Sequence, residues 1–253
     1  MTELAIATIL FIVAFGAILL GLRVRRVLPR RYADEATMAS VKEAVGQMAI
    51  LATVVLGFVT ASAKSNFDAS STLIADSAMR FVTLDRILAG LGPRATDMRA
   101  ELKQILERQV TRMRSSAEVA ESDAAIIERT EEYEAFYRRL ASFEPESDLE
   151  ATDLRRARDL MAELLRSRWM FRLERAGGVP MAFLLFVLVW LAVDFFYVGL
   201  NATDNAFVIL TAVFVALSVA SAMFLMLELE GPASGVIRVS PEPLERALAI
   251  LGR

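Results

Sequence analysis

The sequence predicts an all-α membrane protein with four transmembrane helices and a large soluble helical insert between the second and third. Of its 253 residues, 55% are apolar, and the mean hydropathy of +0.45 is high for a soluble fold. The apolar residues gather in four runs close to the roughly 20 residues that cross a bilayer as a helix. These runs are Leu4 to Leu22, Gly46 to Ala63, Pro180 to Leu200 and Phe207 to Leu229.

Composition excludes several kinds of site. The chain has no cysteine and no histidine, so disulfides, zinc fingers, thiol nucleophiles and imidazole bases are absent. Its 28 basic and 31 acidic residues give a net charge of −3, which offers no basic surface for nucleic acid. Neither a phosphate-binding glycine loop nor a paired-carboxylate motif occurs. We therefore expect no enzymatic activity, no cofactor and no metal site.

The first transmembrane hairpin is expected within residues 1–63, with spans at about 4–22 and 46–63. The first span carries no charge after Glu3, and its arginines follow it, which favours a retained anchor over a cleaved signal peptide. The second hairpin is expected within residues 180–229, with spans at about 180–200 and 207–229. Residues 230–253 then form a tail with a short extended piece and an amphipathic helix.

Residues 64–179 are expected to form the soluble helical domain, because they hold 19 of the 28 basic and 21 of the 31 acidic residues. Apolar residues fall seven apart at Phe67, Ile74, Phe81 and Leu88, which indicates a one-sided helical seam. Since no helix breaker separates this seam from the second span, one helix is predicted from Gly46 to Leu91. A capping-box spacing from Ser147 to Glu150 predicts the start of the last helix of the insert.

Basic residues give a divided prediction of orientation. Lysine and arginine bias short loops to the cytoplasm. A cytoplasmic loop between the first two spans is therefore favoured by its six basic residues, Arg23, Arg25, Arg26, Arg30, Arg31 and Lys42. Lys64, Arg166, Arg168, Arg172 and Arg175 flank the insert and favour the opposite arrangement. The positive-inside rule applies best to short loops, so we slightly favour a cytoplasmic 23–43 loop.

The second span carries a stripe of small and hydroxyl residues that ends in a cation. Because its members alternate steps of four and three, they share one helix face. This face either lines an anion-permeable pore or packs closely against another helix, since glycine and threonine let helix backbones approach in lipid. The stripe comprises Gly46, Ile50, Thr53, Gly57, Thr60 and Lys64.

Asp194 is a charged residue about two thirds of the way along the third span. Ionisable residues in lipid are costly and commonly functional, so Asp194 is a candidate cation, proton or pore-lining site. The alternative is that it lies close enough to the interface to be hydrated, or bonds a hydroxyl of a neighbouring helix.

Two groups of motifs resemble the bacterial bestrophin-like domain family, whose members are four-span membrane proteins of unassigned function. The first group runs from Leu56-Gly57-Phe58 through Ala61-Ser62-Ala63-Lys64-Ser65 and Phe67-Asp68 to Leu84-Asp85-Arg86. The second lies in the tail, at Leu229-Glu230, Pro232, Gly235, Ile237, Val239-Ser240 and Pro243-Leu244. The motif residues whose role is unknown are Ala61, Ser62, Phe67, Asp68, Asp85, Arg86, Glu230, Pro232 and Gly235.

The resemblance implies a relation to bestrophins, which are oligomeric anion channels with two spans, a soluble helical segment and two more spans. It also implies cytoplasmic termini and a cytoplasmic insert, against the orientation favoured above. The chain departs from the family pattern at Gly231 and Ala233, where arginine and phenylalanine are usual, and at Asp194. The aromatic pore neck of bestrophins has no clear counterpart, because Phe58 is the only aromatic residue of the second span.

We therefore expect a homo-oligomer in the bacterial inner membrane that forms an ion pathway for small anions, lined by the second span. Its expected partners are the lipid bilayer and further copies of the chain. The alternative is a membrane-anchored scaffold whose long helices mediate self-association or partner binding without transport.

Overall fold

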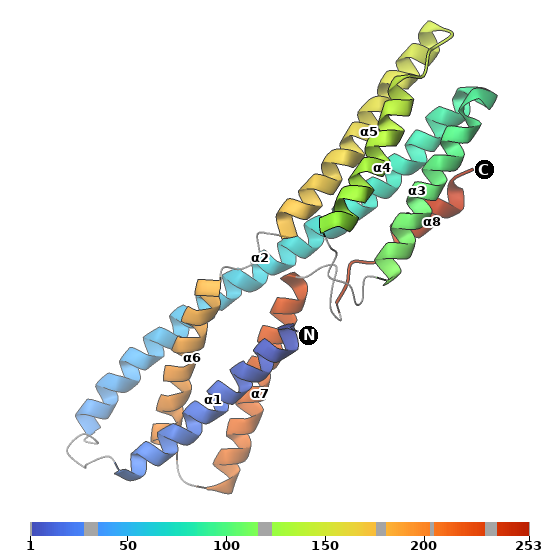
Figure 1. Ribbon diagram of the computed structural model, residues 1–253. Helices are drawn as coiled ribbons and strands as arrows, with labels where there is room; N and C mark the ends of the chain where they lie inside the picture. Colours follow the sequence, from blue (N-terminus) through green and yellow to red (C-terminus); the bar gives the residue numbers. More distant parts are fainter. Residues whose placement is uncertain are drawn as a thin grey trace. The chain divides into compact units, whose positions relative to one another are not determined.

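The computed structural model describes residues 2–27, 35–115, 123–175, 181–202, 205–230 and 237–252. Every regular element within these ranges is a helix (Figure 1). In chain order the elements are α1 (Thr2–Val27), α2 (Glu35–Gly90), the 3₁₀ turn η2 (Gly92–Ala95), α3 (Thr96–Ser115), α4 (Asp123–Ala141), α5 (Asp148–Arg175), α6 (Met181–Asn201), α7 (Ala206–Glu230) and α8 (Glu242–Ile250).

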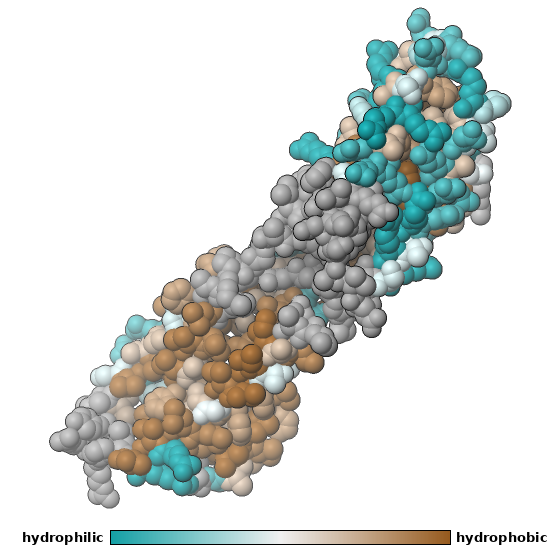
Figure 2. Space-filling model, viewed as in Figure 1, coloured by the Kyte–Doolittle hydropathy of each residue, from teal (hydrophilic) through white to brown (hydrophobic). Residues whose placement is uncertain are grey.

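The helices form two compact units. The apolar unit comprises Met1–Asn66 and Gly178–Glu230, and the polar unit comprises Phe67–Gly177 and Gly231–Arg253. In the view of Figure 2, the coloured surface of the apolar unit is mainly hydrophobic and that of the polar unit mainly hydrophilic. Each unit is described by itself below.

Helix α2 contributes residues to both units. It is continuous from Glu35 to Gly90, so the prediction of a single helix through the second span and the seam is confirmed. The helix begins earlier than the predicted Gly46. Residues 35–45 contain no glycine or proline and include three alanines and two glutamates, which favour helix and extend α2 towards the N-terminus.

Within the apolar unit, α1 lies against α6 and α7. Ala14 and Ile18 of α1 share one buried cluster with Phe195 of α6 and with Ala212 and Ala216 of α7. Nearer its N-terminus, Leu10 shares a second cluster with Val187, Met223 and Met226. Since the residue numbers rise together along α1 and α6 but oppositely along α1 and α7, α6 runs parallel to α1 and α7 antiparallel.

Two glycines allow α1 and α6 to cross in backbone contact. A Cβ atom built on Gly21 would meet the carbonyl oxygen of Phe196, and the backbone nitrogen of Leu200 at 2.7 Å. A Cβ built on Gly199 would meet the carbonyl oxygen of Ile18. Close crossings through small residues are typical of helix pairs in lipid, where packing has to supply the attraction.

Helix α2 runs antiparallel to α1 and α6 in the apolar unit. Ala63 lies in the cluster of Leu10 and Val187, whereas the Met38 carbonyl accepts a hydrogen bond from the Tyr197 hydroxyl at 3.5 Å. Successive helices of this unit therefore alternate in direction. Helices α1 and α6 run one way, and α2 and α7 run the other way. The start of α1, the Ala63 region of α2, the start of α6 and the end of α7 lie at the same end of this unit.

Three described helices are long and apolar enough to cross a membrane, at Leu4–Val27, Met38–Gly90 and Ala206–Leu229. The fourth predicted span corresponds to α6, whose apolar stretch Leu185–Asn201 is shorter. Gly178 to Pro180, which precede α6, lie outside the described residues.

The polar unit has one extended hydrophobic core. The predicted seam of α2 enters this core, because Ile74, Phe81, Leu84 and Leu88 are all buried. The seam therefore packs against the insert of its own chain. The partners of the seam on α3, α4 and α5 include Leu102, Ile105, Leu106, Tyr133, Phe136, Leu140, Leu154, Ala157 and Met161.

The tail returns to this core through α8. Leu244, Ala247 and Leu251 are buried with residues of α2 and α3, and Leu248 packs partly buried against them, so α8 has the predicted amphipathic character. An ion pair between Arg114 of α3 and Glu245 of α8, 2.8 Å long, lies beside them, and its hydrogen bond raises the pKa of Arg114. Residues 237–240, the described part of the predicted extended piece, form no strand.

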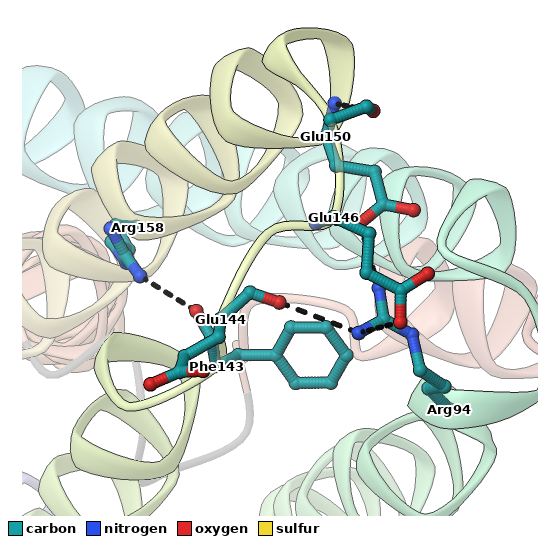
Figure 3. Close-up of polar contacts among 7 residues, drawn as sticks. Arg94, Phe143, Glu144, Glu146, Glu150 and Arg158 are labelled. Carbon is teal, nitrogen blue, oxygen red and sulfur yellow. Dashed lines mark hydrogen bonds and ion pairs between the residues drawn. The ribbon is translucent and has the colours of Figure 1, made fainter.

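Arginines hold the connection between α4 and α5 (Figure 3). The Ser147 half of the predicted capping box is present, since the Glu150 amide donates to Ser147 Oγ at 3.2 Å. The Glu150 carboxylate instead accepts from the amide of Glu146, one residue before the cap, at 2.8 Å. Arg94 pairs with Glu146 at 2.8 Å and Glu150 at 2.7 Å. Arg158 donates to the carbonyls of Leu140, Ala141 and Phe143 at 3.0–3.3 Å and so satisfies the C-terminus of α4.

The glycine crossing yields a matched pair of substitutions on α1. Gly21→Ala is expected to force α1 and α6 apart and to destabilise the apolar unit by about 1–3 kcal/mol, the usual cost of overpacking. Gly16→Ala is the control, because nothing lies within 4 Å of a Cβ built at Gly16. Unfolding of the purified protein by SDS titration measures both. Equal effects of the two variants would contradict the crossing.

Candidate functional site

The predicted stripe on α2 lies on the exposed side of that helix. Ile50, Thr53, Thr60 and Lys64 are exposed, and Ile50 retains 66% of its accessible surface. Within the described part of the chain, nothing lies within 4 Å of a Cβ built on Gly46 or Gly57. The stripe is therefore not a packing face inside one chain, and its role between chains stays a prediction.

A different side of α2 contacts the other helices of the apolar unit. Ala52 and Ala63 are buried, and Val55, Leu56 and Val59 pack against the cluster that contains Leu10 and Val187. Apolar residues also border the stripe, since Leu51, Val54 and Phe58 are exposed. One helix thus has a packed inner side, a small and polar stripe, and an apolar flank.

The threonine hydroxyls of the stripe are bonded to their own helix. Thr53 Oγ1 donates to the Ala49 carbonyl and Thr60 Oγ1 donates to the Leu56 carbonyl, both at 2.8 Å. Each hydroxyl has one hydrogen, so its outward side offers only acceptor lone pairs. Lys64 is then the group of the stripe that carries a positive charge and donor hydrogens.

Asp194 is partly buried on α6 and belongs to the same unit as the stripe. Along α6 it follows Trp190 by four residues and precedes Tyr197 by three, so the three share a helix face. The Tyr197 hydroxyl on this face contacts the Met38 carbonyl of α2, which lies before Gly46, the first residue of the stripe. The stripe itself is exposed, so this contact does not involve it.

The motif residues of the second span and seam differ in their surroundings. Ala61, Ser62, Asp68 and Arg86 are exposed, and Phe67 packs at the margin of the polar core. Asp85 alone among them is buried, with 2% of its accessible surface remaining. In the tail motif the side chain of Glu230 is not described, and Pro232 and Gly235 lie outside the described residues.

Asp85 joins three segments of the polar unit. Arg99 of α3 donates to both of its carboxylate oxygens, from Nε at 2.8 Å and from Nη2 at 3.0 Å. The Gly252 amide donates to Oδ2 at 3.4 Å, from a glycine with a φ of +85° that follows α8. The hydrogen bond to Asp85 raises the pKa of Arg99, so this arginine stays charged.

Arg99 and Glu228 are among the buried or paired polar residues that were not predicted from the sequence. Arg99 bears the ion pair with Asp85, and Glu228 of α7 is buried with 4% of its surface accessible. The spacing of Asp85 and Arg99, on either side of the Gly92-Pro93 break, signals only that two helices meet there. Glu228 lies one residue before the Leu229-Glu230 motif, and its polar type within a long apolar run was the available signal.

Within the described residues, no group of three or more aspartates and glutamates is arranged to hold a metal ion. Arg94 and Arg158 occupy the acidic α4–α5 connection, and the Arg94 guanidinium also lies 5.1 Å from the centre of the Phe143 ring (Figure 3). This cluster is accounted for by ion pairs and helix capping.

Long apolar helices together with a charged helical unit define a helical membrane protein. The model of the Bestrophin-like domain family matches residues 10–244, and the chain belongs to this family. The predicted family resemblance is therefore confirmed. No curated protein sequence matches the chain.

The fold is similar to solved structures of a bacterial bestrophin homologue from Klebsiella pneumoniae. One variant of that protein has a TM-score of 0.59 and 16% sequence identity, and the match covers all of both chains. Another has a TM-score of 0.60, 16% identity and the same full coverage. At this identity the likeness shows a shared fold.

The Asp85 centre predicts a large effect from a single substitution. Arg99→Met leaves a buried carboxylate without its charge partner, which costs about 3–5 kcal/mol in comparable buried pairs. Thermal unfolding of the full-length protein, followed by helical circular dichroism, should show a clearly lowered midpoint. Arg246→Met is the control, because Arg246 pairs with Glu242 on the exposed side of α8, where ion pairs contribute little. A midpoint unchanged by Arg99→Met would contradict the assigned role.

Proposed function

We propose that the chain assembles into a homo-oligomer in the bacterial inner membrane and conducts ions, small anions in particular, along the exposed stripe of α2. In this arrangement α1, α2, α6 and α7 are four transmembrane helices, and residues 64–179 form a soluble domain beside the membrane. Membership of the Bestrophin-like domain family and the shared fold with a bestrophin homologue support the channel class.

The observation that carries the proposal is the uncovered stripe itself. A lipid-facing helix gains nothing from glycines and hydroxyls, because hydrocarbon neither hydrates them nor packs well around them. Thr53, Gly57, Thr60 and Lys64 are nevertheless exposed in the single chain. A ring of chains would bury the apolar flank of Leu51, Val54 and Phe58 between copies and turn the stripe towards a central aqueous path.

Lys64 is the group proposed to select anions. The threonine hydroxyls of the stripe donate inward to Ala49 and Leu56, so they supply no donor hydrogen to an anion in the path. A positive side chain at the end of the stripe attracts anions and repels cations, as rings of lysine do in anion pores. Charge selectivity should therefore follow residue 64, while the conductance depends on the whole stripe.

The first experiment reconstitutes the purified oligomer in liposomes, with its size measured beforehand, and follows chloride efflux under an imposed gradient. Efflux above empty liposomes supports the ion pathway. Sodium efflux under the matching gradient tests the selectivity. An intact oligomer that is silent in both gradients would reject transport, and capture of a partner through residues 64–179 would then test the scaffold function.

Substitutions in the stripe test where ions pass. Thr60→Leu is expected to reduce flux severalfold by placing an apolar side chain in the path. Lys64→Glu is expected to shift the permeability ratio from chloride towards sodium by reversing the charge there.

Thr211→Leu is the matched control for Thr60→Leu. Thr211 of α7 is also exposed, and its hydroxyl also donates to the carbonyl four residues earlier, in Phe207, at 2.9 Å. This variant should conduct as the parent does. If Thr60→Leu and Lys64→Glu leave both the flux and its selectivity unchanged in an intact oligomer, the path does not follow this stripe.

A further inference from the structure

One face of α6 turns towards the first turns of α2. Trp190, Asp194, Tyr197 and Asn201 recur at steps of four, three and four residues and so share that face. The Tyr197 hydroxyl from this face donates to the Met38 carbonyl of α2 at 3.5 Å. The contact fixes which part of α2 lies opposite the end of α6.

The register of the two antiparallel helices places two opposite charges at one level. Asp194 lies three residues before Tyr197, and Lys42 lies four residues after Met38. At 1.5 Å per residue, these steps move about 4.5 Å along α6 and about 6 Å along α2 in the same direction. Residues three and four apart share a side of a helix, so Asp194 and Lys42 flank the Tyr197–Met38 contact on the facing sides.

Two further charged groups near this end are Arg25 and Glu43. Arg25 of α1 donates to the carbonyls of Asn201 and Ala202 and so satisfies the C-terminus of α6. Glu43 follows Lys42 directly and is exposed, about 100° further around α2. Asp194 is partly buried and Lys42 is exposed, with no ion pair between these two described side chains in the isolated chain.

We propose that Lys42 and Asp194 form a charge pair across the α2–α6 contact when the apolar unit lies in a bilayer. An ionised carboxylate in a transmembrane segment is costly unless it is paired or hydrated, and the flexible four-carbon stem of lysine can bring its ammonium group to it. The pair holds the N-terminal turns of α2 against α6. This inference rests on the proposed membrane position of the unit and is independent of ion conduction.

Cysteine cross-linking tests the geometry directly, because the natural chain contains no cysteine. The double variant Lys42→Cys with Asp194→Cys, in membranes, should cross-link within the chain through a short bifunctional thiol reagent. The control pairs Lys42→Cys with Val193→Cys, since Val193 is exposed and lies about 100° around α6 from Asp194. Equal or preferred cross-linking from position 193 would overturn the register.

Charge exchange tests the interaction itself. Lys42→Gln and Asp194→Asn should each lower the thermal midpoint of the full-length protein in lipid nanodiscs, whereas Glu43→Gln should not. The exchanged double variant, Lys42→Asp with Asp194→Lys, should recover at least half of the combined loss. If it is as unstable as the two single effects added together, there is no pair. Neither readout requires ion flux, so a silent channel would not affect the result.

Discussion

A single helix in this protein has to satisfy two environments through one regular periodicity. Between Val45 and Ala63, α2 packs a narrow side of alanines, valines and Leu56 against the other helices of the apolar unit and exposes glycines and threonines. From Phe67 onward, the same 3.6-residue period places Phe81, Leu84 and Leu88 in the polar core. Because α2 contains no break, changes that rotate its register affect the core seam and the candidate stripe together.

Each of the two units is stabilised internally by a different force. The polar unit buries large side chains such as Phe81, Tyr133 and Phe136, so removal of apolar surface from water stabilises it. Lipid supplies no comparable force, and the apolar unit relies on close backbone approach at Gly21 and Gly199. Conservative changes should therefore be tolerated differently, with added volume most harmful in the apolar unit and lost volume most harmful in the polar core.

The sequence was sufficient where periodicity and local chemistry decide the structure. The seam of Phe67, Ile74, Phe81 and Leu88, the N-cap at Ser147 and the amphipathic α8 each follow from residue spacing, and the structure contains all three. Pairings across the chain did not follow, because nothing in the spacing of Asp85 assigns Arg99 or Gly252 to it. The stripe on α2 was predicted as a face, but whether ions pass along it depends on copies that one sequence does not describe.

The bond from Gly252 to Asp85 has a consequence for the order of synthesis. The polar unit is discontinuous, because residues 181–230 separate most of its helices from α8. Its core keeps an open site for Leu244, Ala247 and Leu251 until α8 leaves the ribosome, after both α6 and α7 have been translated. The unit therefore cannot complete its core during translation of the insert, and partly made chains leave exposed the apolar surface that α8 later covers.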